Sequence, residues 1–381
     1  MQQNNKNFLY NTNVRVNTYI NAPFVCNNTN ESKLNIQYMV DGNLGNMDLT
    51  LPSMPNFIPG KSMWDTVNRF ETSSWSSANK GFSTGWKSLD RAFEGGLKPG
   101  FHILGADSNL GKTAFISQLA WQVATNNQDA FVLDFSLDDA MQDKLPRVIS
   151  CDAKIPLGAA QYPNNYSQYP LMLLRRIKTL NKLRSNCYNY NVYDVSKICE
   201  ESETGESNIE DILCIIIKTM VDIKTAGLNK RVVVFLDNFH DLNSAKYKNP
   251  DTKFDEMARI IGEFCDTNRI TFMCTAELKK LNSTRRPILD DIRNNVKIKY
   301  KAMCIMLGYN EVHYKGEQAT VFYQRPNFSN DKQPIFELHF AKNKISGFKG
   351  RLFFTFLPEM STMIECTEQE ENVFKAAIYG S

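Results

Sequence analysis

Apolar residues in this chain gather in short blocks that are separated by longer amphipathic stretches. Two of these blocks, 130–136 and 231–237, are nearly continuous, and the second ends on an acidic residue. Short continuous apolar runs bounded by polar residues are typical of parallel strands that are buried on both faces. Residues 114–123 and 254–268 instead have apolar positions at helical spacing. We therefore expect an α/β fold, a doubly wound and mostly parallel sheet with helices on both faces.

The same patterns predict further elements. Additional strands are expected at 101–104, 270–276, 302–307, 335–340 and 351–356. Residues 140–230 are predicted to be mostly helical, with breaks near 161–165 and at the acidic loop 200–206. Asn208 is expected to cap a helix that runs to Thr225, and Ser62 to cap a short helix at 63–70.

The pattern is weak toward the N-terminus and changes again near the C-terminus. The predicted divisions are an Asn-rich, short irregular arm or small subdomain at 1–60, a linker with a short helix at 61–80, the α/β domain at 81–360 and an amphipathic tail at 361–381. Alternation at 14–20 indicates one strand within the arm. A partly ordered arm is the favoured interpretation, and an arm that docks on a neighbouring subunit is the alternative. In the tail, acidic residues after Thr367 precede apolar ones, which predicts a capped helix.

Composition narrows the class of protein. The 381 residues are 42% hydrophobic and 22% charged, as in globular proteins. No apolar run is long enough to cross a bilayer, and the N-terminus has no apolar signal core, so we expect no membrane partner and a cytoplasmic location. A composition rich in Asn, Lys, Tyr and Ile fits an AT-rich genome, so we expect that cytoplasm to belong to a bacterium or to the host of a bacteriophage. Nine cysteines without a Cys-x-x-Cys pair argue against a disulfide framework and a zinc ribbon. A net charge of +3 implies nucleic-acid binding only through local patches.

Candidate chemistry begins directly after the strand expected at 101–104. A tight loop there leads through Gly-Lys-Thr into a helix, the context of a phosphate-binding loop. Its residues are Ala106, Asp107, Ser108, Asn109, Leu110, Gly111, Lys112 and Thr113. Loop amides and the helix N-terminus attract phosphate oxygens, Lys112 is expected to reach the β- and γ-phosphates, and the Thr113 hydroxyl to bind Mg²⁺. Ala106 stands where the usual pattern has Gly, which is compatible with a backbone that avoids positive φ.

Three acidic residues end predicted strands. Asp237 closes the run 231–237, which suits an acid that orders the water shell of Mg²⁺, although an Asp there can also cap a turn. Asp138 and Glu277 follow two other strands. Since parallel strands present their carboxyl ends at one edge of a sheet, all three acids can face one nucleotide.

From about Ser83 to Phe356 the chain resembles the ATPase domain of DnaB-type replicative helicases, which has a RecA-like fold. The segments that carry the resemblance are 85–91, 95–100, the phosphate loop, 285–287 and 291–293. That family commonly has Ala at the first phosphate-loop position, as at Ala106. The resemblance implies ATP and Mg²⁺ as ligands, a homo-oligomer in the form of a hexameric ring, single-stranded DNA as partner, and a loader or primase protein as a further partner.

The resemblance also assigns roles to single residues. Asp138 falls on the catalytic carboxylate, Glu277 on the Gln that senses the γ-phosphate, and Asp237 on the metal-ordering acid. Lys342 and Lys344 fall on basic residues that reach the ATP site of the neighbouring subunit. Residues implied to face DNA are Arg285, Arg286 and Arg293, with Lys297 and Lys299 beside them. A solvated surface loop is the alternative for these basic residues.

Four departures from the family pattern affect these roles. Asp138 is one methylene shorter than Glu, Glu277 is an anion where the family has an amide, and Lys344 replaces an Arg and so lacks its planar fork. The usual helical N-terminal domain is not recognisable. The leading hypothesis is an ATP-hydrolysing helicase that moves 5′ to 3′ on single-stranded DNA. The alternatives are a RecA-like loader, recombination mediator or regulatory switch without unwinding, and a ring in which ATP is structural.

Overall fold

The computed structural model describes residues 33–40, 43–50, 63–74, 79–249, 252–280, 284–293, 296–324 and 332–380. The chain divides into two compact units, Met1–Ser77 and Ala78–Ser381. In the first, β1 (Lys33–Val40) pairs antiparallel with β2 (Asn43–Thr50), and α1 spans Met63–Ser74. The helix predicted at 63–70 is therefore present and longer. The strand predicted at 14–20 and the cap Ser62 lie outside the described residues.

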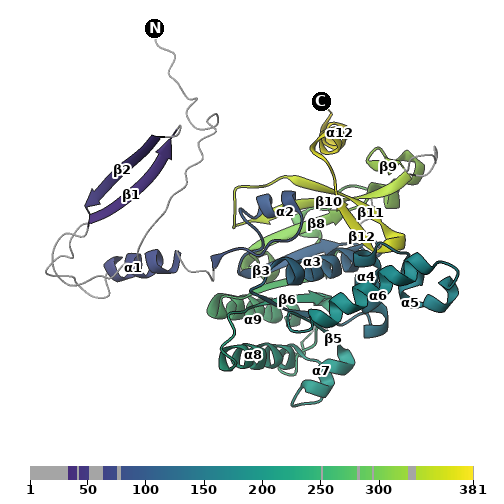
Figure 1. The fold of residues 1–381 in the computed structure, drawn as a ribbon, viewed down its shortest axis with the longest axis horizontal. Coiled ribbons are helices and arrows are strands. Elements are labelled where there is room, and N and C mark those ends of the chain that lie inside the picture. The colour runs from purple at the N-terminus through teal and green to yellow at the C-terminus, as the bar shows by residue number, and fades with distance from the viewer. Residues whose placement is uncertain are drawn as a thin grey trace, which may run out of the picture. The chain divides into compact units, whose positions relative to one another are not determined.

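The second unit is built on a mixed sheet of ten strands (Figure 1). Nine of them follow the order β12-β11-β10-β8-β3-β7-β6-β4-β5, and β9 pairs with β10. The strands are β3 (Gly100–Ala106), β4 (Ala130–Ser136), β5 (Tyr190–Asp194), β6 (Arg231–Asp237), β7 (Thr271–Glu277), β8 (Cys304–Tyr309), β9 (Phe322–Gln324), β10 (Lys332–Asn343), β11 (Arg351–Leu357) and β12 (Thr362–Glu365). The strands from β8 to β5 pair in parallel, whereas β9 to β12 join antiparallel.

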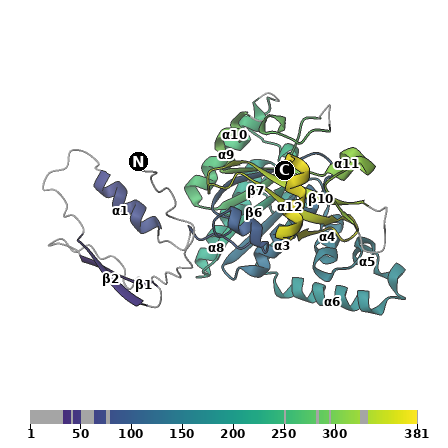
Figure 2. The ribbon, with the colours of Figure 1, turned by 90° about the horizontal axis from the view of Figure 1, so that it is seen from above.

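Helices cover both faces of this sheet, as expected for a doubly wound fold. Figure 1 shows α3 on one side of the sheet and α8 and α9 on the other, and Figure 2 shows α6 and α10 on opposite sides of the unit. The longer helices are α3 (Lys112–Asn126), α4 (Met141–Ala153), α6 (Pro170–Ser185), α8 (Ile209–Thr225), α9 (Lys253–Asn268) and α12 (Glu368–Tyr379). The short ones are α2 (Lys87–Ala92), α5 (Leu157–Gln161), α7 (Val195–Glu201), α10 (Val296–Lys301) and α11 (Glu311–Lys315). None of the described helices is long and apolar enough to cross a membrane.

Each face of the sheet has its own apolar core. On one face Phe115 of α3 stacks on Trp86 with ring centroids 4.9 Å apart and meets Phe354 of β11 edge-on at 5.7 Å. On the other face, Ile212 of α8 and Ile261 of α9 pack on the strands. Because both faces are covered, the central strands are mostly apolar runs instead of alternating between apolar and polar residues. Burial of each large side chain stabilises the fold by about 1.5–3 kcal/mol.

Two parts of the fold differ from the sequence prediction. The stretch 140–230, expected to be mostly helical, contains the edge strand β5, whose five residues are too few for a clear period. The arm expected to be irregular contains the β1–β2 hairpin, and the sequence between its strands is Asp41-Gly42, a dipeptide favoured in two-residue hairpin turns. Two of the predicted caps are confirmed: Asn208 and Thr367 each form a capping box at the start of their helices.

Candidate nucleotide site and basic loop

The phosphate loop joins the central strand β3 to α3. Ala106 is the last residue of β3, an extended position that needs no glycine. Asn109 and Gly111 then take positive φ values of 61° and 101° to turn the chain into α3. A Cβ on Gly111 would lie 3.0 Å from side-chain atoms of Met363 and Phe356. Gly111 is thus required both by its backbone conformation and by close packing on β11 and β12.

Lys112, the first residue of α3, lies at the centre of this site. Its Nζ donates to the main-chain oxygens of Ala106 and Asp107, each at 2.9 Å. Burial lowers the pKa of Lys112, while the surrounding carboxylates, of which Asp237 has the largest effect, raise it. The first N–H groups of α3 have no partner within the helix, and its dipole favours an anion at this end. The loop thus offers both amides and a cation to a phosphate.

Three carboxylates surround Lys112 at the carboxyl ends of adjacent strands. Asp237 at the end of β6 is only 3% exposed and accepts a hydrogen bond from the Thr275 hydroxyl. Asp138, after β4, is exposed, and its pKa is raised first by partial burial and then by Asp139, Asp237 and Glu277. The structure therefore brings Lys112, Asp138, Asp237 and Glu277 together, as the strand pattern predicts.

Asp139 is placed differently from Asp138, although the two are adjacent. Its carboxylate pairs with Arg147 of α4 at 3.1 Å, and its main-chain oxygen accepts from Ser136. The carboxylate of Asp139 is therefore engaged by Arg147, so Asp138 is the better candidate for the catalytic carboxylate.

We call residues 284–293, which contain the three arginines expected to face DNA, the basic loop. Glu277 is connected to this loop through His240 and Arg293. The Glu277 carboxylate pairs with Arg293 at 2.9 Å. His240 Nδ1 accepts the Glu277 main-chain N–H at 3.0 Å, and its Nε2 lies 3.0 Å from the Arg293 carbonyl. Since a carbonyl only accepts, the Nε2 must carry the proton and the ring is neutral. Burial, the largest influence, lowers the pKa of His240 and favours this neutral form.

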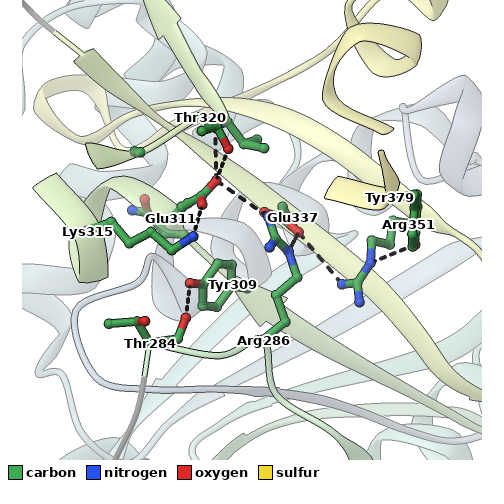
Figure 3. A network of polar contacts seen from close by, with 12 residues as sticks. Thr284, Arg286, Tyr309, Glu311, Lys315, Thr320, Glu337, Arg351 and Tyr379 are labelled. Atoms are coloured by element: carbon green, nitrogen blue, oxygen red, sulfur yellow. Dashed lines mark hydrogen bonds and ion pairs between the residues drawn. The ribbon is translucent and has the colours of Figure 1, made fainter. Parts of the chain in front are cut away.

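The three arginines expected to face DNA have different surroundings. Arg285 makes two 2.7 Å hydrogen bonds to Asp291, and its side chain is 47% exposed. Arg293 is 57% exposed beside Glu277. Arg286 instead points into the fold, where it makes two 2.7 Å bonds to Glu337 of β10 and is 20% exposed (Figure 3). The structure thus gives Arg286 an internal partner and leaves Arg285 and Arg293 nearer solvent.

Lys342 and Lys344 lie at the other edge of the sheet. The Lys344 main-chain N–H donates to Met303, and the Met303 N–H donates to Phe101, so Lys344 is level with the start of β3. Lys342 Nζ donates to the carbonyls of Lys299 and Tyr300, and Lys344 Nζ lies 3.5 Å from the latter. Within the described residues neither lysine makes an ion pair. Burial, reinforced by Lys344, lowers the pKa of Lys342 to about 8.

Comparison with known proteins places this fold in a family. Residues 81–364, most of the chain, match the family model described as DnaB-like helicase C terminal domain. The chain belongs to the DnaB-like helicase C-terminal domain family. Comparison with curated proteins gives no match.

Solved structures agree with this DnaB-like domain at the level of the fold. One is described as an ATPase domain, with a TM-score of 0.63, 19% identity, and coverage of 81% of this chain and 100% of that chain. Another is described as a DnaB-like replicative helicase and its interactions with primase, with a TM-score of 0.59, 19% identity, and coverage of 79% of this chain and 67% of that chain.

The oxygen donors of this DnaB-like domain are compatible with Mg²⁺. Asp237 and the Thr113 hydroxyl lie beside the phosphate loop, and the described residues contain no group of three or more His, Cys, Asp or Glu that could enclose a metal. Mg²⁺ usually keeps several waters and is held by one or two protein oxygens together with substrate phosphates. A small set of oxygen donors next to a phosphate loop suits that mode of binding.

Two tyrosines near the DnaB-like phosphate loop were not assigned a role from the sequence. Tyr309 at the end of β8 is 1% exposed. Tyr314, which the sequence offers no reason to select, donates from its hydroxyl to Asp107 Oδ2 at 3.0 Å. No local pattern reveals this contact, because the two residues are 207 positions apart and meet only through the sheet order.

Proposed function

We propose that this chain is an ATP-dependent, ring-forming motor that moves on single-stranded DNA, with each ATP held by one subunit and its site completed by the next. The observation that carries the proposal is the position of the two unpaired lysines. Phe101, which is level with Lys344, lies five residues before Ala106, or roughly 17 Å along β3 at about 3.3 Å per residue. A lysine side chain cannot span that distance. Lys342 is level with Ile103, about 10 Å before Ala106, and its Nζ contacts the carbonyls of Lys299 and Tyr300 instead of the phosphate loop. We therefore infer that both lysines serve the site of a neighbouring molecule.

The residues of one subunit account for binding and for activation of water. Phosphates occupy the amides at the start of α3, and Lys112 leaves its two carbonyl partners to contact the β- and γ-phosphates. Mg²⁺, held by Thr113 and through water by Asp237, would neutralise charge on the phosphates. Asp138 orients the attacking water, and its raised pKa makes it a better proton acceptor than an ordinary Asp.

The neighbouring subunit supplies the remaining positive charge. Lys344 and Lys342 approach the γ-phosphate in place of the family's arginine, as ammonium groups without a bidentate fork. Hydrolysis therefore requires assembly, and a hexameric ring is the expected form. The protein is expected in the cytoplasm of a bacterium or of a phage-infected host, with a primase or loader as partner.

DNA is proposed to contact the loop that begins at Arg285. Arg285 and Arg293 are exposed enough to exchange their carboxylate partners for phosphates, and Lys297 lies exposed at the start of α10. Arg286 is proposed to hold the base of this loop through Glu337. Contacts of this kind follow the backbone and weaken with salt.

The test measures ATP turnover with and without single-stranded DNA, followed by displacement of a strand from a forked duplex. We expect turnover that DNA stimulates, and a loss of at least about 100-fold in Lys112→Ala, with the exposed Lys349→Ala as control. Turnover without strand displacement would favour the loader or switch alternative. Full turnover in Lys112→Ala would remove the assignment of the nucleotide site.

A further inference from the structure

The phosphate loop and the basic loop are connected by two stacked tyrosines. Tyr314 of α11 and Tyr309 at the end of β8 stack with ring centroids 5.1 Å apart and an angle of 9° between the rings. The outer ends of this pair reach different loops. Tyr314 donates to Asp107, and Tyr309 donates to the Thr284 carbonyl at 2.6 Å (Figure 3).

The Tyr314 end fixes an acidic side chain inside the phosphate loop. Asp107 Oδ2 accepts the Tyr314 hydroxyl, and Oδ1 accepts the Ser108 N–H at 2.8 Å. Both carboxylate oxygens are thus engaged. An unrestrained carboxylate in this loop would repel the phosphates and compete for the same amides. The Tyr314 hydroxyl therefore controls where a negative charge lies next to the nucleotide.

The Tyr309 end fixes the base of the basic loop. Tyr309 bonds to Thr284, and the guanidinium carbon of Arg286 lies 5.0 Å from the centroid of the Tyr309 ring. Arg286 is itself held by Glu337 and lies 3.5 Å from Glu311. Glu311 belongs to α11, the helix that carries Tyr314, and it also accepts from the Val321 N–H (Figure 3). The two loops are therefore attached to one compact group of side chains.

We propose that Tyr314 and Tyr309 are positioning residues that couple occupancy of the basic loop to the geometry of the phosphate loop. This inference rests on the proposed function and names the residues through which DNA affects the nucleotide site of the same subunit. When phosphates of DNA bind Arg285 and Arg293 in place of their carboxylate partners, the neighbouring loop residues Thr284 and Arg286 shift against Tyr309. The stacked rings pass that shift to Asp107, because Tyr309 is packed in the core and the ring of the half-buried Tyr314 lies against it.

Hydroxyl deletions separate coupling from simple packing. Tyr314→Phe keeps the stack and removes the bond to Asp107, whereas Tyr309→Phe keeps the stack and removes the bond to Thr284. A hydrogen bond between neutral groups changes an equilibrium by about 3- to 10-fold, and one to a carboxylate such as Asp107 by about 10-fold or more. We expect Tyr314→Phe to raise the KM for ATP by about the latter factor with little change in kcat. Both variants should lower the ratio of DNA-stimulated to unstimulated turnover by at least about threefold. Tyr188→Phe, at a side chain that is 80% exposed, is the control.

A double-mutant cycle with Asp107→Ala identifies the partner. Once Asp107 is gone, Tyr314→Phe should have no further effect on the KM for ATP. The effects would multiply if Tyr314 acted elsewhere, which would overturn the assignment. Unchanged ratios of DNA-stimulated to unstimulated turnover in both Phe variants would overturn the coupling. A lower ratio that is fully explained by loss of folded protein, seen as a fall in the unfolding midpoint, would overturn it as well. A wild-type chain without DNA-stimulated turnover would overturn the proposed function as well, so the wild-type arm tells the two failures apart.

Discussion

β10 lies beside basic groups in opposite situations at the two edges of the parallel strands. Glu337 pairs with Tyr309 at the carboxyl edge of the parallel strands, and it lies against Arg286 and Arg351. Asn343 pairs with Cys304 at the other edge, where the side chains of the nearby Lys342 and Lys344 contact main-chain oxygens and make no ion pair with any described residue. The same strand thus has a group of compensated charges near its middle and, among the described residues, a group of uncompensated charges at its C-terminal end.

This difference separates structural charges from charges that are available to a ligand. A buried carboxylate between two guanidinium groups has satisfied hydrogen bonds, and removing one partner leaves a charge without compensation. Lys342 and Lys344 have no acidic ion-pair partner among the described residues and repel each other, and an approaching phosphate would relieve that repulsion. Paired groups are expected to determine stability, and the unpaired ones to determine activity.

The largest effect is expected at Glu337, which pairs with Arg286 and Arg351. Glu337 is fully buried, and burial raises its pKa even though Arg286 opposes the shift. Glu337→Ala leaves Arg286 and Arg351 without this partner and should lower the free energy of unfolding by about 3–5 kcal/mol. Glu337→Gln keeps the shape and should cost less. Chemical denaturation measures both against Glu203→Ala in the exposed acidic loop. A loss of unfolding free energy below about 1 kcal/mol for Glu337→Ala would contradict the claim that this paired group determines stability.

The next effect concerns ATP turnover and the two lysines, Lys342 and Lys344, that make no ion pair within the described residues. Lys344→Ala should lower kcat for ATP about 100-fold, less than loss of an arginine finger because an ammonium lacks the fork. The free energy of unfolding should change by less than about 0.5 kcal/mol. Steady-state turnover and denaturation are measured beside Lys349→Ala, an exposed lysine in the same connection. Equal turnover in the two variants would mean that Lys344 has no role in hydrolysis.

A smaller effect is expected from pH. Lys342, with a pKa of about 8, loses its charge as pH rises through that value, so its contribution to turnover should fall as the solution passes from below to above about pH 8. Its folded pKa lies below the unfolded value of 10.5, so the unfolded chain binds more protons between about pH 8 and 10.5 and stability rises with pH there. Lys342→Arg should flatten both pH profiles. Identical profiles for the wild type and this variant would show that Lys342 does not titrate in this range.

The smallest effect is expected from an exposed pair. Glu277→Gln releases Arg293 from its internal counter-ion, and should raise affinity for single-stranded DNA about two- to threefold with a steeper salt dependence. The free energy of unfolding should change by at most about 1 kcal/mol, because such pairs contribute little. Fluorescence anisotropy at several salt concentrations measures the affinity. Glu263→Gln breaks a comparable exposed pair with Arg259 and is the control. Weaker binding by Glu277→Gln would contradict a DNA role for Arg293.

Much of the sheet was predictable because its strands are buried on both faces. The apolar runs at β4 and β6 coincide with the predicted 130–136 and 231–237, and their ends place Asp138 and Asp237 at one edge. A short edge strand such as β5 has no comparable signal, since it has few residues and lies at the end of the strand order.

The surroundings of each basic residue were not predictable from the sequence. Arg285 and Arg286 are adjacent, yet one pairs with Asp291 in its own loop and the other with Glu337, 51 positions away on an antiparallel strand. Likewise, the distance of Lys344 from the phosphate loop of its own subunit follows from strand register. Register is set by the packing of the whole sheet and not by local pattern.

The central claim is that a phosphate loop in one subunit works with the lysines of the next. The direct test mixes Lys112→Ala subunits, which keep the lysines, with Lys344→Ala subunits, which keep the phosphate loop, and measures ATP turnover across mixing ratios. We predict turnover well above that of either variant alone, with a maximum at intermediate ratios. Turnover that never exceeds the sum of the two variants, in assemblies shown to exchange subunits, would contradict the claim.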